Sequence, residues 1–203
     1  EVNVMDYCKI SSFKDLSDPV NIGSVSISGF RDEIIRGIYS YGFEDPTYIQ
    51  SLGIRAVATG KDVIGQAQSG TGKTGAFTIG LLNLIDENVN EIQGIIVVHT
   101  NEMVLQIENV IRELAKYTKI RFISCSKNTR TRDNIDALTG YKNNGLIPHI
   151  IIASPGRLVD MMNRTNNYNE NIINTKTIKT LILDEADELL GTTNRSGNRR
   201  DNR

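Results

Sequence analysis

A glycine-rich stretch followed at once by a helical pattern is the first feature of this sequence that could do chemistry. It runs from Ala67 to Thr74 with the sequence AQSGTGKT. Glycines in such a loop let backbone N–H groups close around phosphates, and the first turn of the helix adds its positive end. We expect Lys73 to reach the β- and γ-phosphates of a nucleotide and the Thr74 hydroxyl to hold Mg²⁺. Ala67 stands where the general pattern has glycine, which leaves a plain glycine-rich turn as the alternative.

An acidic tetrapeptide is the second such feature. The sequence DEAD, Asp184 to Asp187, directly follows a short apolar run. Open α/β sheets bind ligands beyond the carboxyl ends of their strands, so carboxylates at this position can serve a nucleotide held by the first motif. We interpret Asp184 as the partner of Mg²⁺ and Glu185 as the residue that polarises the attacking water. Taken alone, the tetrapeptide is also explained as an acidic helix start that favours the helix dipole.

Short apolar runs rich in valine and isoleucine alternate with longer amphipathic segments along the chain. Near-continuous apolar runs are typical of strands that are covered on both faces, and a helix between successive strands indicates parallel pairing. The expected strands cover residues 62–65, 94–100, 120–125, 149–154 and 180–184, and the expected helices cover residues 31–43, 75–86, 102–117 and 156–164. The pattern predicts an α/β fold in which a parallel sheet is flanked by helices on both faces.

Length and composition fit one folded domain. The chain has 203 residues, of which 39% are hydrophobic and 23% charged, and its apolar runs are far shorter than a membrane span. A net charge of -1 gives no general attraction to nucleic acid, so any such binding must come from local sites. We divide the chain into an irregular extension (1–29), a folded domain (30–190) with a polar loop at 163–177, and a disordered polar tail (191–203).

The two cysteines, Cys8 and Cys125, lie far apart and form no metal-binding or redox spacing. We expect both to be reduced, buried thiols, which fits a reducing compartment. The sequence starts at Glu1 without an initiator methionine or a basic and apolar leader, which leaves targeting open, and a cytoplasmic location is our working expectation.

The phosphate loop and DEAD, in this order and on these strands, resemble the motifs of DEAD-box ATP-dependent RNA helicases. The similarity runs from about Arg31 to Leu190 and is strongest to the translation initiation factor 4A branch. The resemblance implies a RecA-like P-loop domain, the N-terminal one of two, that uses ATP and Mg²⁺. It implies ATP hydrolysis coupled to RNA remodelling when a second RecA-like domain is present in cis or in trans. RNA, single-stranded or as a short duplex, and translation initiation factors are the implied partners.

The segment RGIYSYGFEDPTYIQ, residues 36–50, matches the glutamine motif of that family. The resemblance implies that Gln50 contacts adenine. An amide offers a donor and an acceptor together, which suits N6 and N7 of adenine and would favour ATP over GTP. Taken alone, Gln50 could equally be a solvent-facing residue of a helix.

The resemblance also assigns individual roles around the nucleotide. The aromatic residue that stacks on adenine in the family falls at Val25, and an insertion near residues 23–29 would bring Phe13 or Phe30 into that role. The implied catalytic residues are Lys73, Asp184 and Glu185, with Thr74 and Asp184 at the metal. The implied nucleotide-binding residues are Phe43, Gln50, Ala67, Gln68, Ser69, Gly70, Thr71, Gly72, Lys73, Thr74 and Asp187.

The motifs that contact RNA in the family are only partly kept. In HTNEM, residues 99–103, Asn101 replaces the family's arginine, and the family's Gly-Gly doublet aligns with Lys127 and Asn128. SPGR, residues 154–157, is kept and could hold a phosphate, although the same letters also suit a plain turn from strand to helix. The implied RNA-binding residues are Thr100, Glu102, Pro155, Gly156 and Arg157.

Two classes of function remain open from the sequence. The first is the ATP-binding domain of an RNA helicase, and the second is a helicase-derived module that holds ATP, RNA or a translation partner without turnover. The family's Ser-Ala-Thr motif does not follow DEAD, so we expect either a fragment of a longer protein or a truncated gene product. A DNA helicase or another P-loop ATPase is disfavoured by Gln50 and its surrounding motif.

Overall fold

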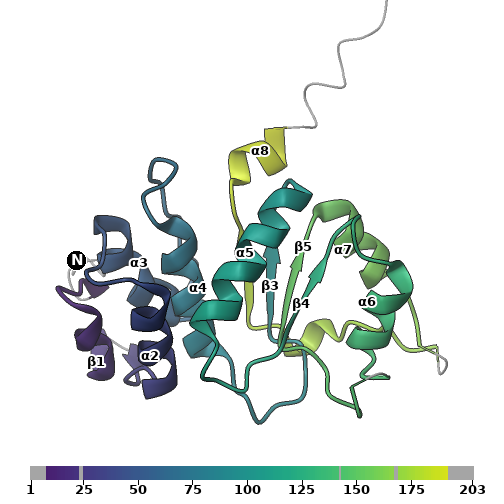
Figure 1. Cartoon of the computed structure of the whole chain (residues 1–203), viewed down its shortest axis with the longest axis horizontal. Helices are drawn as coiled ribbons and strands as arrows, with labels where there is room; N and C mark the ends of the chain where they lie inside the picture. Colours follow the sequence, from purple (N-terminus) through teal and green to yellow (C-terminus); the bar gives the residue numbers. More distant parts are fainter. Residues whose placement is uncertain (1–7, 23–24, 142, 167–168, 192–203) are drawn as a thin grey trace, which may run out of the picture.

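A parallel sheet of four strands lies at the centre of the computed structural model, which describes residues 8–22, 25–141, 143–166 and 169–191 (Figure 1). The strands are β3 (Gly94–Val97), β4 (Phe122–Cys125), β5 (Ile150–Ala153) and β6 (Thr180–Leu183). Their order across the sheet is β4-β5-β3-β6, and all three neighbouring pairs are parallel. The expected strands at 94–100, 120–125, 149–154 and 180–184 are thus confirmed in shorter form.

Helices cover both faces of this sheet, as the sequence predicts. The helices of the described chain are α2 (Asp32–Tyr41), α3 (Tyr48–Ala58), α4 (Lys73–Leu84), α5 (Asn101–Leu114), α6 (Thr131–Leu138), α7 (Pro155–Met162) and α8 (Ala186–Gly191). Successive side chains of a strand point to opposite faces. One face contributes to the core shared with α2, α3, α4 and α5, through Ile96, Ile150 and Ile152. The other face packs with α7 and residues 172–173, through Ile95, Ile151 and Ala153.

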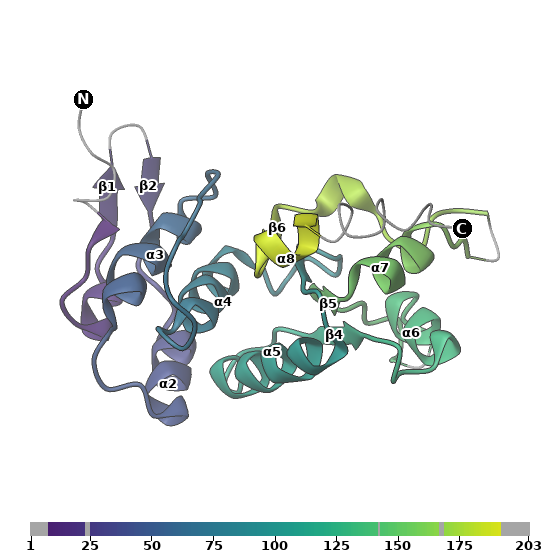
Figure 2. The same cartoon turned by 90° about the horizontal axis from the view of Figure 1, so that it is seen from above.

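The N-terminal segment is not the irregular extension that the sequence predicts. It contains a 3₁₀ helix, η1 (Phe13–Ser17), and an antiparallel hairpin of β1 (Val20–Ile22) and β2 (Val25–Ile27). Ser12 and Asp15 form a capping box that starts η1, while Phe13 and Leu16 are fully buried. Seen from above, this segment lies at the opposite end of the molecule from α6 and α7 (Figure 2). The prediction fails because short caps and a three-residue strand pair give little periodicity.

The expected strand at residues 62–65 is absent, and this prediction is wrong. Residues 60–66 are exposed, with Ile64 95% accessible. The sheet ends instead at β6, whose Leu181 and Leu183 are 59% and 45% exposed rather than covered on both faces. An apolar run forms a strand only where a neighbouring strand completes its hydrogen bonds, and no described residue pairs with 62–65. The run predicts strand propensity but not the pairing partner.

Smaller features complete the fold. The polar loop at 163–177 carries an isolated bridge between Thr165 and Asn171 and a 3₁₀ turn, η2 (Thr175–Thr177). Cys8 and Cys125 are both free and buried, as expected. Among the described residues, no helix is both long and apolar enough to cross a membrane. The expected disordered tail lies outside the described residues beyond position 191.

Candidate active site

The phosphate loop owes its shape to two glycines. Gly70 and Gly72 have φ angles of 78° and 95°, in the left-handed region that side chains with a Cβ rarely adopt. Gly72 is the N-cap of α4, and a Cβ added there would lie 2.7 Å from the Gln50 amide nitrogen. Any larger residue would therefore clash and strain the backbone. The backbone N–H groups of the loop and of the first turn of α4 are left for an anion.

Lys73 is the first residue of α4, and the loop closes over its side chain. Its ammonium group donates hydrogen bonds to the carbonyl oxygens of Ala67 (2.5 Å) and Gln68 (3.4 Å). Thr74 follows as the second helical residue and is half-buried. The lysine charge is therefore held beneath the loop by neutral oxygens, which a bound phosphate can replace with a stronger, charged partner.

The glutamine motif is hydrogen-bonded to the phosphate loop. Gln50 is 1% exposed; its amide oxygen accepts from the Thr47 backbone N–H (3.0 Å), and its amide nitrogen donates to the Gly72 carbonyl (3.4 Å). The Thr47 hydroxyl donates to the Thr71 carbonyl at 2.9 Å. Thr47 was not among the residues predicted to have a role. It lies three residues before Gln50, and the two residues form the capping box that starts α3. The contact of Gln50 with adenine stays a prediction.

Phe13 is the expected stacking candidate that lies beside the glutamine motif. Its ring stacks on Phe43, with centroids 6.0 Å apart and planes at 20°. Phe43 in turn lies against the first turn of α4, where a Cβ on Gly75 would be 3.0 Å from the ring. Phe13 is fully buried, Phe30 is 4% exposed, and Val25 belongs to the hairpin strand β2. The structure thus favours Phe13 by position, while its contact with a base stays a prediction.

The DEAD carboxylates lie at the carboxyl end of β6. The Asp184 backbone N–H donates to the Val97 carbonyl (3.0 Å), and its carboxylate accepts from the Glu185 N–H (3.1 Å). Burial raises the pKa of Asp184, which is 9% exposed, whereas the nearby charges of Lys73 and His99 act in the opposite direction. Asp187 is exposed in the first turn of α8.

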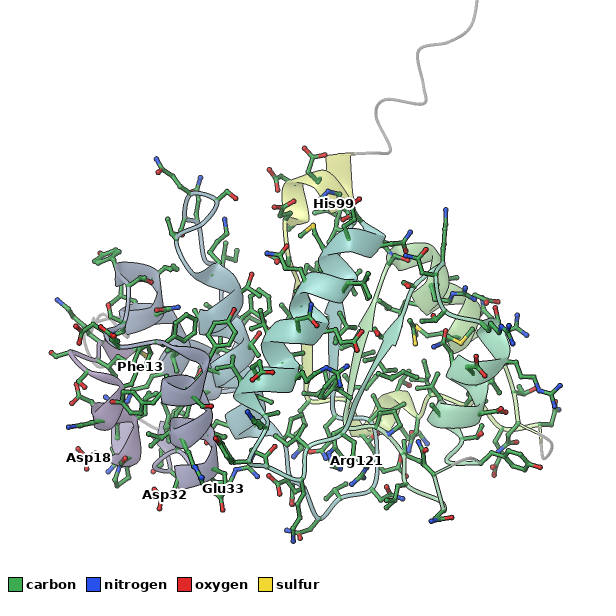
Figure 3. All side chains as sticks on the ribbon, in the orientation of Figure 1. Phe13, Asp18, Asp32, Glu33, His99 and Arg121 are labelled. Atoms are coloured by element: carbon green, nitrogen blue, oxygen red, sulfur yellow. The ribbon has the colours of Figure 1, made fainter. Side chains whose placement is uncertain are left out.

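Glu185 has an unusual backbone and one close side-chain neighbour. Its φ angle is 53°, in the left-handed region that few non-glycine residues occupy. Its Oε2 atom lies 3.3 Å from Nδ1 of His99, a residue to which the sequence analysis assigned no role. Figure 3 shows His99 close to α8, at the same end of the sheet. The contact joins residues far apart in the sequence, so no local pattern could reveal it.

The residues present fit Mg²⁺ bound together with a nucleotide. No described group of three or more histidine, cysteine or acidic side chains could hold a metal by itself. Mg²⁺ often takes only one or two protein oxygens and completes its shell with substrate phosphates and water. One hydroxyl from Thr74 and one carboxylate from Asp184 are the donor set that such a site needs.

The expected RNA-binding residues gather beyond β3 and β5. Thr100 caps α5, accepting from the Met103 N–H at 3.2 Å, and Glu102 is exposed on the first turn. Asn101, which replaces the family's arginine, accepts from the Lys127 backbone N–H (3.1 Å) and so ties α5 to the loop after β4. Lys127 and Asn128 are both exposed in that loop.

Arg157 supports the same loop from α7. Its guanidinium donates to the Ser126 (3.2 Å) and Thr129 (3.1 Å) carbonyls and to the Thr131 hydroxyl, and lies 3.6 Å from Asp160. The side chain is 13% exposed, while Pro155 and Gly156 in front of it are exposed. In this arrangement Arg157 orders residues 126–131, and the exposed N-terminus of α7 offers backbone N–H groups to a phosphate.

A family comparison agrees with this geometry. The model of the DEAD/DEAH box helicase family matches residues 47–200, which is more than half of the chain. The chain belongs to this family. The match includes both the phosphate loop and the DEAD carboxylates.

Known relatives and solved structures narrow the class. The chain is 42% identical over 163 residues to the ATP-dependent RNA helicase FAL1 of Eremothecium gossypii, covering 80% of this chain and 38% of the relative. It is 41% identical over 160 residues to the eukaryotic initiation factor 4A of Drosophila melanogaster, covering 79% and 37%. The fold matches a variant of S. cerevisiae Dbp5 bound to RNA and ADP BeF3, with a TM-score of 0.70, 27% identity, and coverage of 89% and 40%. The chain therefore spans about two-fifths of the length of these relatives.

Proposed function

We propose that this chain is the N-terminal ATP-binding domain of an ATP-dependent RNA helicase. The observation that carries the proposal is a phosphate loop that closes over the Lys73 side chain, in a domain whose buried Asp184 stands at the carboxyl end of β6. Lys73 and Asp184 are more than 100 residues apart in the sequence, and burial raises the pKa of Asp184 while the Lys73 charge is one of the smaller effects that oppose this rise. The relatives named as ATP-dependent RNA helicases support the same assignment.

In this proposal each motif has a distinct task. Lys73 and the backbone N–H groups of the loop bind the β- and γ-phosphates, and Gln50 holds the loop and contacts adenine. Thr74 and Asp184 bind Mg²⁺, which supplies charge neutralisation on the phosphates when present. Glu185 orients the attacking water and accepts its proton as the water oxygen bonds to the γ-phosphorus, while the bond from that phosphorus to the β–γ bridging oxygen breaks and ADP leaves. A second RecA-like domain, in cis or in trans, completes the site.

RNA is the proposed partner on the loops beyond β3, β4 and β5. A solved structure of the S. cerevisiae Dbp5 variant contains RNA, and in this chain hydrogen bonds of Asn101 and Arg157 hold the loop after β4. Lys127 and Asn128 carry side chains where the family has glycines, so we expect weak, salt-dependent binding of single-stranded RNA. Translation initiation factors as partners and a cytoplasmic location belong to the same proposal, by similarity to initiation factor 4A.

A module that binds without turnover is the second candidate, because of those RNA-side replacements. The test mixes the full chain with the second RecA-like domain of a related helicase and measures RNA-stimulated ATP hydrolysis. We expect slow hydrolysis by the chain alone and a gain when the domain is added, because an arginine supplied across such an interface is worth about 10³ to 10⁵ in rate. Glu185→Gln should abolish the gain and keep nucleotide binding. No gain with the wild-type chain, despite ATP binding, would favour the binding module.

A further inference from the structure

We propose that His99 is a positioning residue that holds the carboxylate of Glu185 in its working orientation from the neighbouring strand. This inference rests on the proposed function, because it gives Glu185 the task of orienting water. It concerns a side chain that stands next to the catalytic carboxylate without itself touching the nucleotide.

Strand register brings the two residues together. β3 and β6 are parallel neighbours, and Val97 pairs with Leu183 at the end of the ladder. The Asp184 N–H still donates to the Val97 carbonyl, so the two chains stay side by side beyond the last pair. His99 lies two residues after Val97, and Glu185 lies two residues after Leu183. If the register of the two strands is extended, His99 and Glu185 therefore lie opposite each other. Neighbouring strands run about 4.8 Å apart, within reach of side chains at the same level.

The imidazole offers a nitrogen that lacks a partner. Nδ1 of His99 is buried and makes no hydrogen bond to any residue that the structure describes. Glu185 Oε2 lies 3.3 Å from it, within the range of an ion pair. A buried polar atom normally finds a partner, and a small rotation of either side chain turns this contact into a hydrogen bond. The carboxylate is the group that can satisfy this nitrogen.

Glu185 needs such support because its own surroundings constrain it little. Its side chain is 39% exposed, and its backbone lies in the left-handed region with φ at 53°. Strained backbone of this kind is found at functional sites, where the surrounding structure holds it in place. A carboxylate at the surface samples several rotamers unless a neighbour restrains it. A donor fixed in the short segment between β3 and α5 selects the rotamer that faces His99.

The first arm of the test uses the full chain and observes the contact itself. The sequence has two histidines, so ¹⁵N-edited NMR resolves each imidazole. The partner of one ring nitrogen determines which tautomer is populated. We expect His99 to carry its proton on Nδ1 in the wild-type chain and to shift toward the Nε2 form in Glu185→Ala, while Asp187→Ala leaves it unchanged. His149, whose Nδ1 accepts from the Arg121 N–H, is the internal control. An unchanged His99 tautomer in Glu185→Ala would overturn the proposal.

The second arm measures catalysis with the second RecA-like domain supplied as above. His99→Ala should lower kcat by about 10- to 100-fold, the range expected when a catalytic group is misplaced. KM for ATP and nucleotide affinity should stay within about twofold, since the proposal assigns His99 a contact with Glu185 and none with the nucleotide. His99→Asn should restore most of kcat because its amide nitrogen can donate from nearly the same place.

The two arms separate this inference from the function on which it rests. Wild-type hydrolysis with equal kcat in His99→Ala would overturn the positioning role and leave the proposed function intact. Absence of hydrolysis in the wild-type mixture would count against the proposed function, and the tautomer of His99 would still decide whether it holds Glu185.

Discussion

The two halves of the candidate site are built in different ways. The phosphate loop is held by local side chains, with Thr47 and Gln50 bonded to the carbonyls of Thr71 and Gly72, while the residues before it are exposed and unpaired within the described chain. Asp184 is held by the sheet, through strand register. A loop motif can therefore take its shape from a few nearby residues, whereas the carboxylate is placed by pairing between distant segments.

The largest expected effect is on stability, and it compares a residue of the sheet with a residue before the phosphate loop. Ile96 is fully buried in the central strand β3, and Ile96→Ala should lower the free energy of unfolding by about 2–5 kcal/mol, from lost burial and a cavity. Ile64, 95% exposed before the phosphate loop, is the matched control, and Ile64→Ala should change it by less than about 0.5 kcal/mol. Urea denaturation measures both. A similar loss in both variants would mean that residues 62–65 are part of the folded core.

Lys73→Ala tests whether the phosphate loop contributes to ATP binding. Loss of the ammonium removes charge-assisted hydrogen bonds worth about 1.5–3 kcal/mol, so ATP affinity should fall by roughly 10- to 100-fold. Lys61→Ala, an exposed lysine just before the loop, is the control and should bind ATP like the wild type. Titration with a fluorescent ATP analogue, with circular dichroism to confirm the fold, measures the difference. Unchanged affinity in Lys73→Ala would remove the loop from the site.

The pH dependence of stability tests how firmly the sheet buries His149. It is fully buried at the start of β5, and burial, helped by Arg121, lowers its pKa from 6.5 to about 4. The unfolded chain therefore binds a proton that the folded chain does not, and the free energy of unfolding should fall by about 1–3 kcal/mol as the pH drops from 6.5 to 4. The His149→Gln variant should lack this fall in the free energy of unfolding when urea titrations are repeated between pH 6.5 and 4. Parallel pH curves for the two proteins would contradict it.

Gln50→Ala should have the smallest effect and separates two roles of this residue. Loss of its bonds to Thr47 and Gly72 should weaken ATP and GTP alike, by about 0.5–1.5 kcal/mol. Loss of an adenine contact should weaken ATP further and narrow its advantage over GTP. Competition titrations with both nucleotides measure the gap. Equal losses for ATP and GTP would assign Gln50 to the loop alone.

The features predicted correctly from the sequence are those that depend on residues close together in the chain. The apolar runs at 94–97, 150–153 and 180–183 gave strands, and the letters around Lys73 gave a loop with left-handed glycines. The run at 62–65 also contains valine and isoleucine but lacks a pairing partner among the described residues, and pairing is a property of the whole sheet. Composition indicates a tendency to form strands and cannot supply the neighbour.

Contacts across the sheet could not be predicted in the same way. His99 contacts Glu185 because β3 and β6 are adjacent parallel strands in register. The order of strands in the sheet cannot be deduced from the sequence of either segment alone. The stacking of Phe13 on Phe43 likewise depends on how the 3₁₀ helix η1 packs against the rest of the domain. The sequence suggested candidate residues for the chemistry more readily than the residues that contact and orient them.

Calorimetric titration of ATP, with Mg²⁺ and with EDTA, tests most directly whether the two halves form one site. The account predicts that the wild-type chain binds ATP more tightly with Mg²⁺, and that Asp184→Asn removes this difference while keeping the metal-free affinity set by Lys73. Equal binding in both conditions by the wild-type chain, or a full Mg²⁺ effect in Asp184→Asn, would contradict it.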